Sequence, residues 1–222
     1  MGGLGTFEEP PAREGVENCE QPPTTTDLPT HTPMRILTSL LACLASVAAF
    51  AAAELGKPAP EFTGKTLDGK TVNLADYKGK TVVLEWYNPH CPVVRKFYDA
   101  GKMQEFQKQV IAQGGAWLII HTAGDPITES STYYPGTVIE DTNQSIGRAY
   151  DAKVTPHCYV IDGKGVLVYK GAIDNGTVAT KATEIDKSTN YVLAAVKAIK
   201  EGKAPEVTNT KPYGCGVKYN KL

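Results

Sequence analysis

The sequence lacks several features that would each assign it to a class of protein. Its 222 residues carry a formal net charge of −1, so no excess of one charge attracts it to nucleic acid or to an anionic membrane surface. Apart from a segment that reads as a processing signal, no apolar run is long enough for a permanent membrane span. Neither a Gly-x-Gly-x-x-Gly nor a Walker-type loop is present, and we therefore predict no organic cofactor.

The N-terminal part of the chain does not read as part of a folded domain. Residues 1–33 are rich in Pro, Thr, Glu and Gly without an apolar period, which predicts a disordered upstream extension. Residues 34–53, MRILTSLLACLASVAAFAAA, are typical of a secretory signal peptide. We predict a translation start at Met34, cleavage after Ala53 and a periplasmic or secreted protein. The alternatives are a buried apolar helix and, at residues 40–43, a lipoprotein-type anchor.

Cysteine is scarce in the remaining chain, which we divide into a domain at 54–205 and a C-terminal tail at 206–222. Of the five cysteines, Cys91, Cys158 and Cys215 lie there. Disulfides persist in an oxidising compartment, where three cysteines permit one disulfide and leave one thiol over.

The apolar pattern of the domain predicts alternating strands and helices. Strands are expected on both sides of Asp68-Gly69, over 81–87 and 116–123, and in a hairpin around Asp162–Gly165; helices are expected over 92–111, within 143–152 and over 188–202. Residues 124–142 read as a loop. We expect Asp141 or Asn143 to cap the second helix and Ser188 the third. This order predicts an α/β fold, with a central mixed β-sheet flanked by helices and an N-terminal β-hairpin extension.

The stretch WYNPHCPVV places Cys91 where a strand gives way to a helix. Backbone N–H groups and the helix dipole stabilise a thiolate at such a position and lower its pKa. Pro92 suits the first helical turn, and His90 adds positive charge when it is protonated. The position three residues after Cys91 holds Val94 instead of a second cysteine. The pattern predicts a nucleophilic thiol whose partner lies elsewhere, and the alternative is a small buried cysteine.

Three stretches resemble the redoxin/peroxiredoxin (AhpC/TSA) branch of the thioredoxin superfamily, in its single-cysteine peroxiredoxin-like subgroup: GKPAPEFTGKTLDGKTVNLADYKGKTVVLEWYNPHCP, VTPHCYVIDGKGVLVYKGAID and PYGCGVKY. The resemblance implies a thioredoxin-like fold and a thiol-disulfide oxidoreductase with an antioxidant role. It makes Cys91 the nucleophile and Pro156 a cis-proline facing it. It matches Glu85 to a buried acid that shuttles protons, although a surface carboxylate at a strand edge is the alternative. The substrate-contacting positions that it implies are Thr155, His90, Pro92 and His157.

The chain departs from the peroxiredoxin motif Pro-x-x-x-Thr-x-x-Cys. Asn88 stands at the threonine position and Leu84 at the proline position. The peroxidatic cysteine of that family aligns with Val94. These departures argue against peroxidase activity, and we expect disulfides as substrates.

A mixed disulfide on Cys91 needs a second thiolate to resolve it. Cys215, in a glycine-flanked tail, is favoured over Cys158, and an external thiol donor is the third option. Two other functions stay open. One is a Cu or Zn site, for which the candidate ligands are His90, Cys91, His157 and Cys158, with His121 as a possible addition. The other is a non-catalytic module that binds peptides beside Pro156.

Overall fold

A computed structural model describes residues 52–122 and 127–221 of the chain. The extension predicted at 1–33 and nearly all of the signal peptide lie outside these residues. In the two described ranges, no helix is long and apolar enough to cross a membrane.

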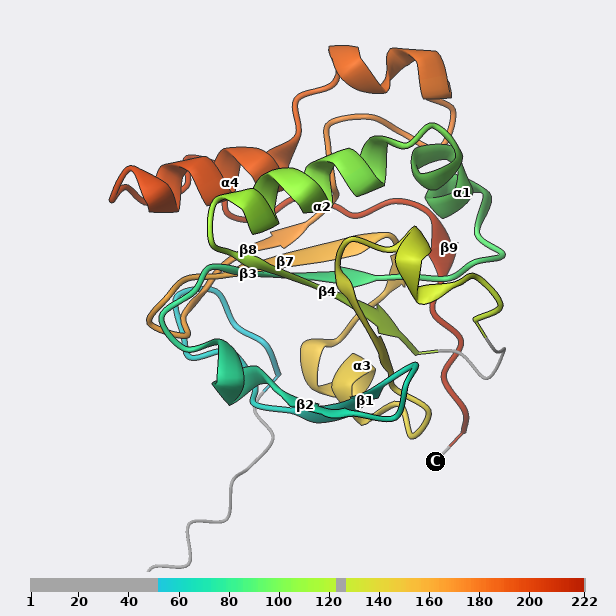
Figure 1. Ribbon diagram of the computed structural model, residues 1–222. Helices are drawn as coiled ribbons and strands as arrows, with labels where there is room; N and C mark the ends of the chain where they lie inside the picture. Colours follow the sequence, from blue (N-terminus) through green and yellow to red (C-terminus); the bar gives the residue numbers. More distant parts are fainter. Residues whose placement is uncertain (1–51, 123–126, 222) are drawn as a thin grey trace, which may run out of the picture. The chain divides into compact units, whose positions relative to one another are not determined.

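A seven-stranded mixed sheet forms the centre of the domain (Figure 1). Its strands are β1 (Thr63–Thr66), β2 (Thr71–Asn73), β3 (Val82–Trp86), β4 (Ala116–His121), β5 (Thr137–Glu140), β7 (His157–Ile161) and β8 (Leu167–Gly171). They are ordered β2-β1-β5-β4-β3-β7-β8. β3, β4 and β5 run parallel, whereas β1, β2, β7 and β8 pair antiparallel with their neighbours.

Helices cover both faces of the sheet, which confirms the predicted α/β class (Figure 1). On one face lie α1 (Pro92–Asp99), α2 (Lys102–Ala112) and α4 (Tyr191–Lys200), and on the other lies α3 (Ser145–Tyr150). Short 3₁₀ turns occupy η1 (Leu74–Tyr77), η2 (Ser131–Tyr133) and η3 (Ala182–Lys187). Because successive strand residues face opposite sides, Val83 packs into the core under α1, α2 and α4, while Leu84 packs into the core on the α3 side.

Both predicted hairpins are confirmed. β1 and β2 pair across Asp68-Gly69, and β7 and β8 pair across the turn that begins at Asp162. Gly69 and Gly165 have φ angles of 79° and 83°, a backbone region that glycine enters without steric cost. The N-terminal hairpin joins the main sheet through the pairing of β1 with β5.

Three local predictions are wrong. The helix expected over 92–111 is two helices, because Gly101 adopts a left-handed φ of 71° between them. The loop expected over 124–142 contains β5, a four-residue strand that aligns parallel to β4. The last helix is capped by Asn190 rather than Ser188, since the Asn190 side chain accepts a hydrogen bond from the Leu193 N–H at 2.9 Å.

The predicted capping of the short helix is confirmed for Asp141, although Gln144 is the residue that immediately precedes α3. The Asp141 carboxylate accepts hydrogen bonds from the N–H groups of Ile146 and Gly147, at 3.0 and 2.8 Å. It therefore satisfies two of the free donors at the helix start.

The C-terminal tail returns to the domain instead of hanging free. Its residues Cys215–Gly216 form β9, which pairs antiparallel with β6 (Val154–Thr155) in a separate two-stranded sheet. No local pattern predicted this pairing, and it brings the tail to the loop that precedes β7.

Candidate active site

Cys91 is the residue immediately before α1, and Pro92 occupies the first helical position. The Cys91 carbonyl accepts the first helical hydrogen bond, from Arg95 N–H at 2.9 Å. The strand-to-helix placement expected from sequence is therefore confirmed. The residue is only 1% exposed, so its sulfur lies beneath other groups.

The loop around Pro156 lies directly against this sulfur. The Thr155–Pro156 peptide bond is cis, as the resemblance implied. The Cys91 thiol donates a hydrogen bond to the Thr155 carbonyl oxygen at 3.1 Å. β6 and β7 flank this bend, so the sheet fixes the position of the carbonyl relative to the thiol.

Cys215 reaches the same place from the tail. In the β6–β9 pairing it stands opposite Thr155, whose hydroxyl donates to the Cys215 carbonyl at 3.4 Å. The Cys215 thiol is close enough to Cys91 to lower the pKa of that thiol. Cys215 is half-buried, in contrast to the fully buried Cys91. The fold thus brings two thiols together beside the cis-proline.

The two thiols differ in acidity. Burial raises the pKa of Cys91, but hydrogen bonds from the Cys215 thiol, the Thr155 side chain and the Val94 backbone outweigh it, so the pKa lies below the usual thiol value. Burial and the hydrogen bond with Cys91 raise the pKa of Cys215 to about 11. Cys91 is therefore the sulfur that ionises first.

Lys96 is a charged neighbour that sequence reasoning missed. Burial lowers the pKa of its ammonium group, while the negative charges of Asp174 and Cys91 oppose that shift. Its Nζ donates to the carbonyls of Thr177 and Thr180, at 3.1 and 2.9 Å. Lys96 lies five residues after Cys91, and no sequence motif marks it. Only the folded structure shows that its charge interacts with the thiol.

Cys158 is the second residue of β7, lies opposite Glu85 of β3 and is completely buried. Burial raises the pKa of its thiol well above the usual value, and the nearby Glu85 and Asp174 add to this effect. Cys158 is therefore held as a neutral thiol in the core, and it is a poor source of thiolate.

Glu85 is buried in β3, so the alternative of a surface carboxylate is wrong. Its Oε2 accepts hydrogen bonds from Trp117 at 2.8 Å, Tyr98 at 3.1 Å and Gln107 at 3.3 Å. Burial raises its pKa to about 7 against the lowering effect of these bonds. Its backbone partner is Cys158, and it belongs to the interior behind the thiol pair.

The ligand set of the metal hypothesis is not assembled. His157 lies on the opposite side of β7 from Cys158, where its Nδ1 is 3.0 Å from the Tyr159 hydroxyl and 3.3 Å from Lys153 N. Burial, then the charge of Lys170, lowers the pKa of His157 to about 4. Among the residues that the structure describes, no three His, Cys, Asp or Glu side chains are grouped to hold a metal ion.

Two further histidines were considered as ligands. His90 is exposed, and its backbone N–H donates to the Asn88 side chain at 2.8 Å. His121 is buried at the end of β4, with Nδ1 3.3 Å from the Tyr87 carbonyl oxygen. Neither forms a group with the two thiols.

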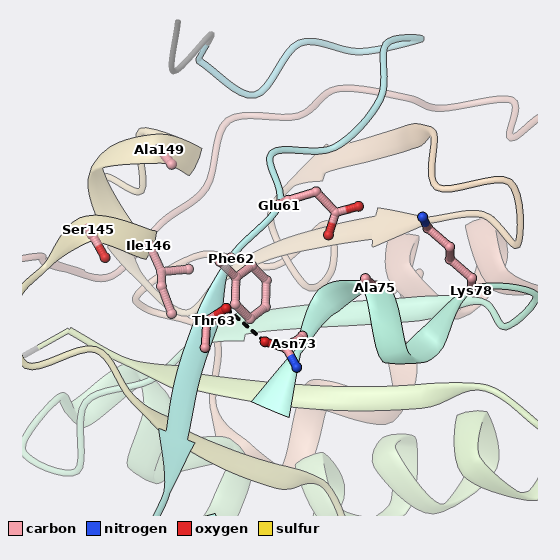
Figure 2. A pocket seen from close by; sticks show the side chains of 9 residues that line it. All are labelled: Glu61, Phe62, Thr63, Asn73, Ala75, Lys78, Ser145, Ile146 and Ala149. Atoms are coloured by element: carbon pink, nitrogen blue, oxygen red, sulfur yellow. Dashed lines mark hydrogen bonds between the residues drawn. The ribbon is translucent and has the colours of Figure 1, made fainter. Parts of the chain in front are cut away.

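A surface hollow of about 650 Å³ does not belong to the thiol site (Figure 2). Its lining residues come from the segment around β1, from η1 and its flanks, and from α3. They are Glu61, Phe62, Thr63, Asn73, Ala75, Lys78, Ser145, Ile146 and Ala149. No cysteine is among them, so this hollow is separate from the thiol site.

A sheet of this topology, with a cysteine at a helix start and a cis-proline loop against its sulfur, defines a thioredoxin-like protein. The crystal structure of an uncharacterized conserved protein from Geobacillus kaustophilus is similar, with a TM-score of 0.62 and 26% identity over 76% of this chain and 94% of that one. The chain belongs to the AhpC/TSA family, whose model matches residues 55–170.

Two relatives assign the broad class of reaction. The thiol-disulfide oxidoreductase ResA of Bacillus subtilis (strain 168) is 28% identical over 120 residues, which cover 51% of this chain and 64% of that protein. A thioredoxin peroxidase of Echinococcus granulosus is 33% identical over 136 residues, covering 52% of this chain and 69% of that protein. Both relatives are oxidoreductases by name, and this chain is assigned to that class.

Proposed function

We propose that the chain is a thiol-disulfide oxidoreductase that uses Cys91 as its nucleophile. The observation that carries this proposal is that both cysteines meet Thr155, beside the cis bond that precedes Pro156. The Cys91 thiol donates to the Thr155 carbonyl oxygen, and Cys215 stands opposite Thr155 in the β6–β9 pairing. The lowered pKa of Cys91 increases the fraction of thiolate, which is the form that attacks disulfides. The complete burial of Cys158 and the position of the half-buried Cys215 opposite Thr155 support Cys215 as the resolving partner.

The proposed reaction has three exchanges. The Cys91 thiolate attacks one sulfur of a substrate disulfide, forms a mixed disulfide and releases the other half as a thiolate. The Cys215 thiolate then attacks the Cys91 sulfur and releases the second half as a thiolate. Two equivalents of an external thiol reduce the Cys91–Cys215 disulfide and are themselves joined in a disulfide. One substrate disulfide is reduced for each two donor thiols oxidised.

The other predicted residues take supporting roles in this proposal. Thr155 and Pro156 position the substrate beside the sulfur, and Pro92 fixes the helix start. The exposed His90, which precedes Cys91 in the chain, is a contact for the incoming substrate.

Two buried residues have indirect roles in the proposal. His157 supports the cis-proline loop through its hydrogen bond with Lys153 N. Glu85 serves as the internal acid of the core.

We also propose that the protein is exported, on the strength of the signal-like pattern at 34–53. Expression of the full chain in a Gram-negative host followed by mass measurement of the periplasmic product tests this directly. A mature N-terminus near Glu54 is expected. Retention of the uncut chain in the cytoplasm would contradict export and leave the redox chemistry unaffected.

Three single substitutions test the redox proposal in an assay that couples an external thiol donor to insulin or a small disulfide. Cys91→Ser should lower turnover by at least about 100-fold, because a serine hydroxyl is not a nucleophile at neutral pH. Cys215→Ser should accumulate a mixed disulfide on Cys91, visible as added mass. Cys158→Ser is the matched control, and its turnover should stay within about twofold of the parent because that thiol stays neutral in the core.

The proposal fails if Cys91→Ser keeps its turnover, or if the pH midpoint for alkylation of Cys91 lies at or above that of a free cysteine, about 8.5. Hydrogen peroxide in place of the disulfide measures the antioxidant activity. With Asn88 and Leu84 in place of the threonine and proline of the peroxidatic motif, we expect peroxide to be the slower substrate.

A further inference from the structure

The tail occupies the strand position beside the nucleophile. Val154 and Thr155 pair with Gly216 and Cys215, and the Val217 N–H donates to the Lys153 carbonyl at 3.0 Å. Extended peptides bind an exposed strand edge by making these same backbone hydrogen bonds. In this chain, the edge next to Pro156 is already paired with the tail.

Gly214 lets the tail come this close. Its φ is 136°, and a Cβ atom at this position would collide with the Thr155 carbonyl oxygen and come within 3.5 Å of the Pro156 ring. Only glycine has both the conformational freedom and the absence of a side chain that this contact requires.

A buried carboxylate fixes the part of the tail that precedes Cys215 in the chain. The Tyr213 hydroxyl donates a hydrogen bond to Asp174, which is 3% exposed and also accepts the Gly176 N–H at 2.9 Å. The Lys96 ammonium lies 5.7 Å from the centre of the Tyr213 ring. This clamp ties the tail to α1 and to the loop after β8.

A second clamp fixes the tail beyond Cys215. The Tyr219 hydroxyl donates to the Ala152 carbonyl at 2.9 Å, and the Arg148 guanidinium donates to the Asn220 carbonyl at 2.6 Å. Asn220 N–H in turn donates to Gln144 at 2.8 Å. With both sides held, the segment Tyr213–Gly216 cannot drift from the strand edge without breaking several contacts.

We propose that the segment Tyr213–Gly216 is a built-in strand that excludes extended polypeptides from the edge beside Pro156 and so makes the enzyme selective for low-molecular-weight disulfides over protein disulfides. This inference rests on the proposed function and names its substrate class. A small disulfide needs only enough displacement of the tail to meet the Cys91 sulfur. A polypeptide strand needs the whole segment to leave, because both require the backbone groups of Thr155.

The test compares two tail variants with two matched controls. Tyr213→Phe removes the hydroxyl that binds Asp174, and Tyr191→Phe removes a tyrosine hydroxyl at the start of α4, outside the segment Tyr213–Gly216. Gly214→Ala introduces the clash with Thr155, whereas Gly202→Ala places a methyl group in open space at a φ of 71°. Each variant keeps Cys91 and Cys215. The ratio of kcat/KM for insulin to that for bis(2-hydroxyethyl) disulfide is measured, together with deuterium exchange of the backbone amides at 215–217.

Both tail variants should exchange these amides faster, and the insulin-to-small-disulfide ratio of both should rise. For Tyr213→Phe the expected rise is about tenfold, the effect of losing one hydrogen bond to a carboxylate. Both controls should keep the parental ratio within about twofold. If the amides of both tail variants exchange faster but the insulin-to-small-disulfide ratio stays at the parental value, the proposed selectivity is wrong. If exchange at 215–217 is unchanged in both tail variants, the proposed clamp is wrong. If the parent and all variants turn over neither substrate, the proposed function itself has failed, and the exchange data still report on the clamp.

Discussion

At the residue scale, three cysteines of the described chain lie in three environments. Neighbouring groups lower the pKa of Cys91, Cys215 is one of these neighbours, and Cys158 is enclosed in the core. The residue type is the same in each case, so the chemistry comes from the neighbouring donors and from burial. The proposed division into nucleophile, resolving thiol and inert thiol follows from these differences.

Glu85 gives a prediction about stability and pH. Its pKa rises from 4.5 to about 7 on burial, so the folded state keeps a proton that the unfolded chain has already released. The stabilising contribution of this proton is complete below about pH 4.5 and is lost as the pH rises to about 7. Urea unfolding should show a loss of about 3 kcal/mol from this group between those pH values, and Glu85→Gln should remove it.

The exposed Glu105 provides the control for that measurement. Glu105→Gln makes the same chemical change at an exposed position of α2 and controls for the substitution itself. The lowered pKa of His157 contributes stability that grows over the same pH range, so the test is the difference between the parent and Glu85→Gln. Identical pH profiles for these two proteins between pH 4.5 and 7 would contradict the raised pKa of Glu85.

At the element scale, the start of α4 depends on a single side chain. The side-chain oxygen of Asn190 (Oδ1) accepts the Leu193 N–H at 2.9 Å, which satisfies a donor that the helix itself leaves free. Asn190→Ala should therefore lower the free energy of unfolding by about 1 kcal/mol in urea titrations. Ser188→Ala, two residues earlier, should cost less than about 0.5 kcal/mol. Equal losses in the two variants would refute the assignment of the cap.

Elements with strong local signals could be predicted from the sequence, and those set by distant partners could not. The strand before Cys91 and both hairpins follow from apolar runs and turn residues. β5 has only four residues, is preceded by Pro135-Gly136 and exists because it pairs with β4. A strand this short, beside turn-forming residues, carries too little local preference to identify.

At the scale of the whole molecule, the sequence predicts Cys91 and Pro156 as parts of the candidate site, but it does not predict that the C-terminal tail joins them. Cys91 and Pro156 lie in recognisable motifs, whereas the pairing of Thr155 with Cys215 joins segments 60 residues apart. Asp174 and Tyr213 both lie in stretches that carry the family resemblance, yet only the folded chain shows the hydrogen bond between them. Such contacts depend on the tertiary structure, and the hydrophobic pattern of the sequence does not predict them.

A disulfide between Cys91 and Cys215 would make the melting temperature of the protein depend on its oxidation state. Residues 91 and 215 are 124 positions apart (215 − 91), and β4, β5, α3, β7, β8 and α4 lie between them. A covalent link would turn this stretch into a ring and restrict the unfolded ensemble, an entropic gain of about 4–5 kcal/mol for an unstrained bond. The oxidised protein should melt at a higher temperature than the reduced one in paired calorimetric scans, and Cys215→Ser should abolish the difference. Equal melting temperatures for the parent with and without reductant would show that the ring does not form.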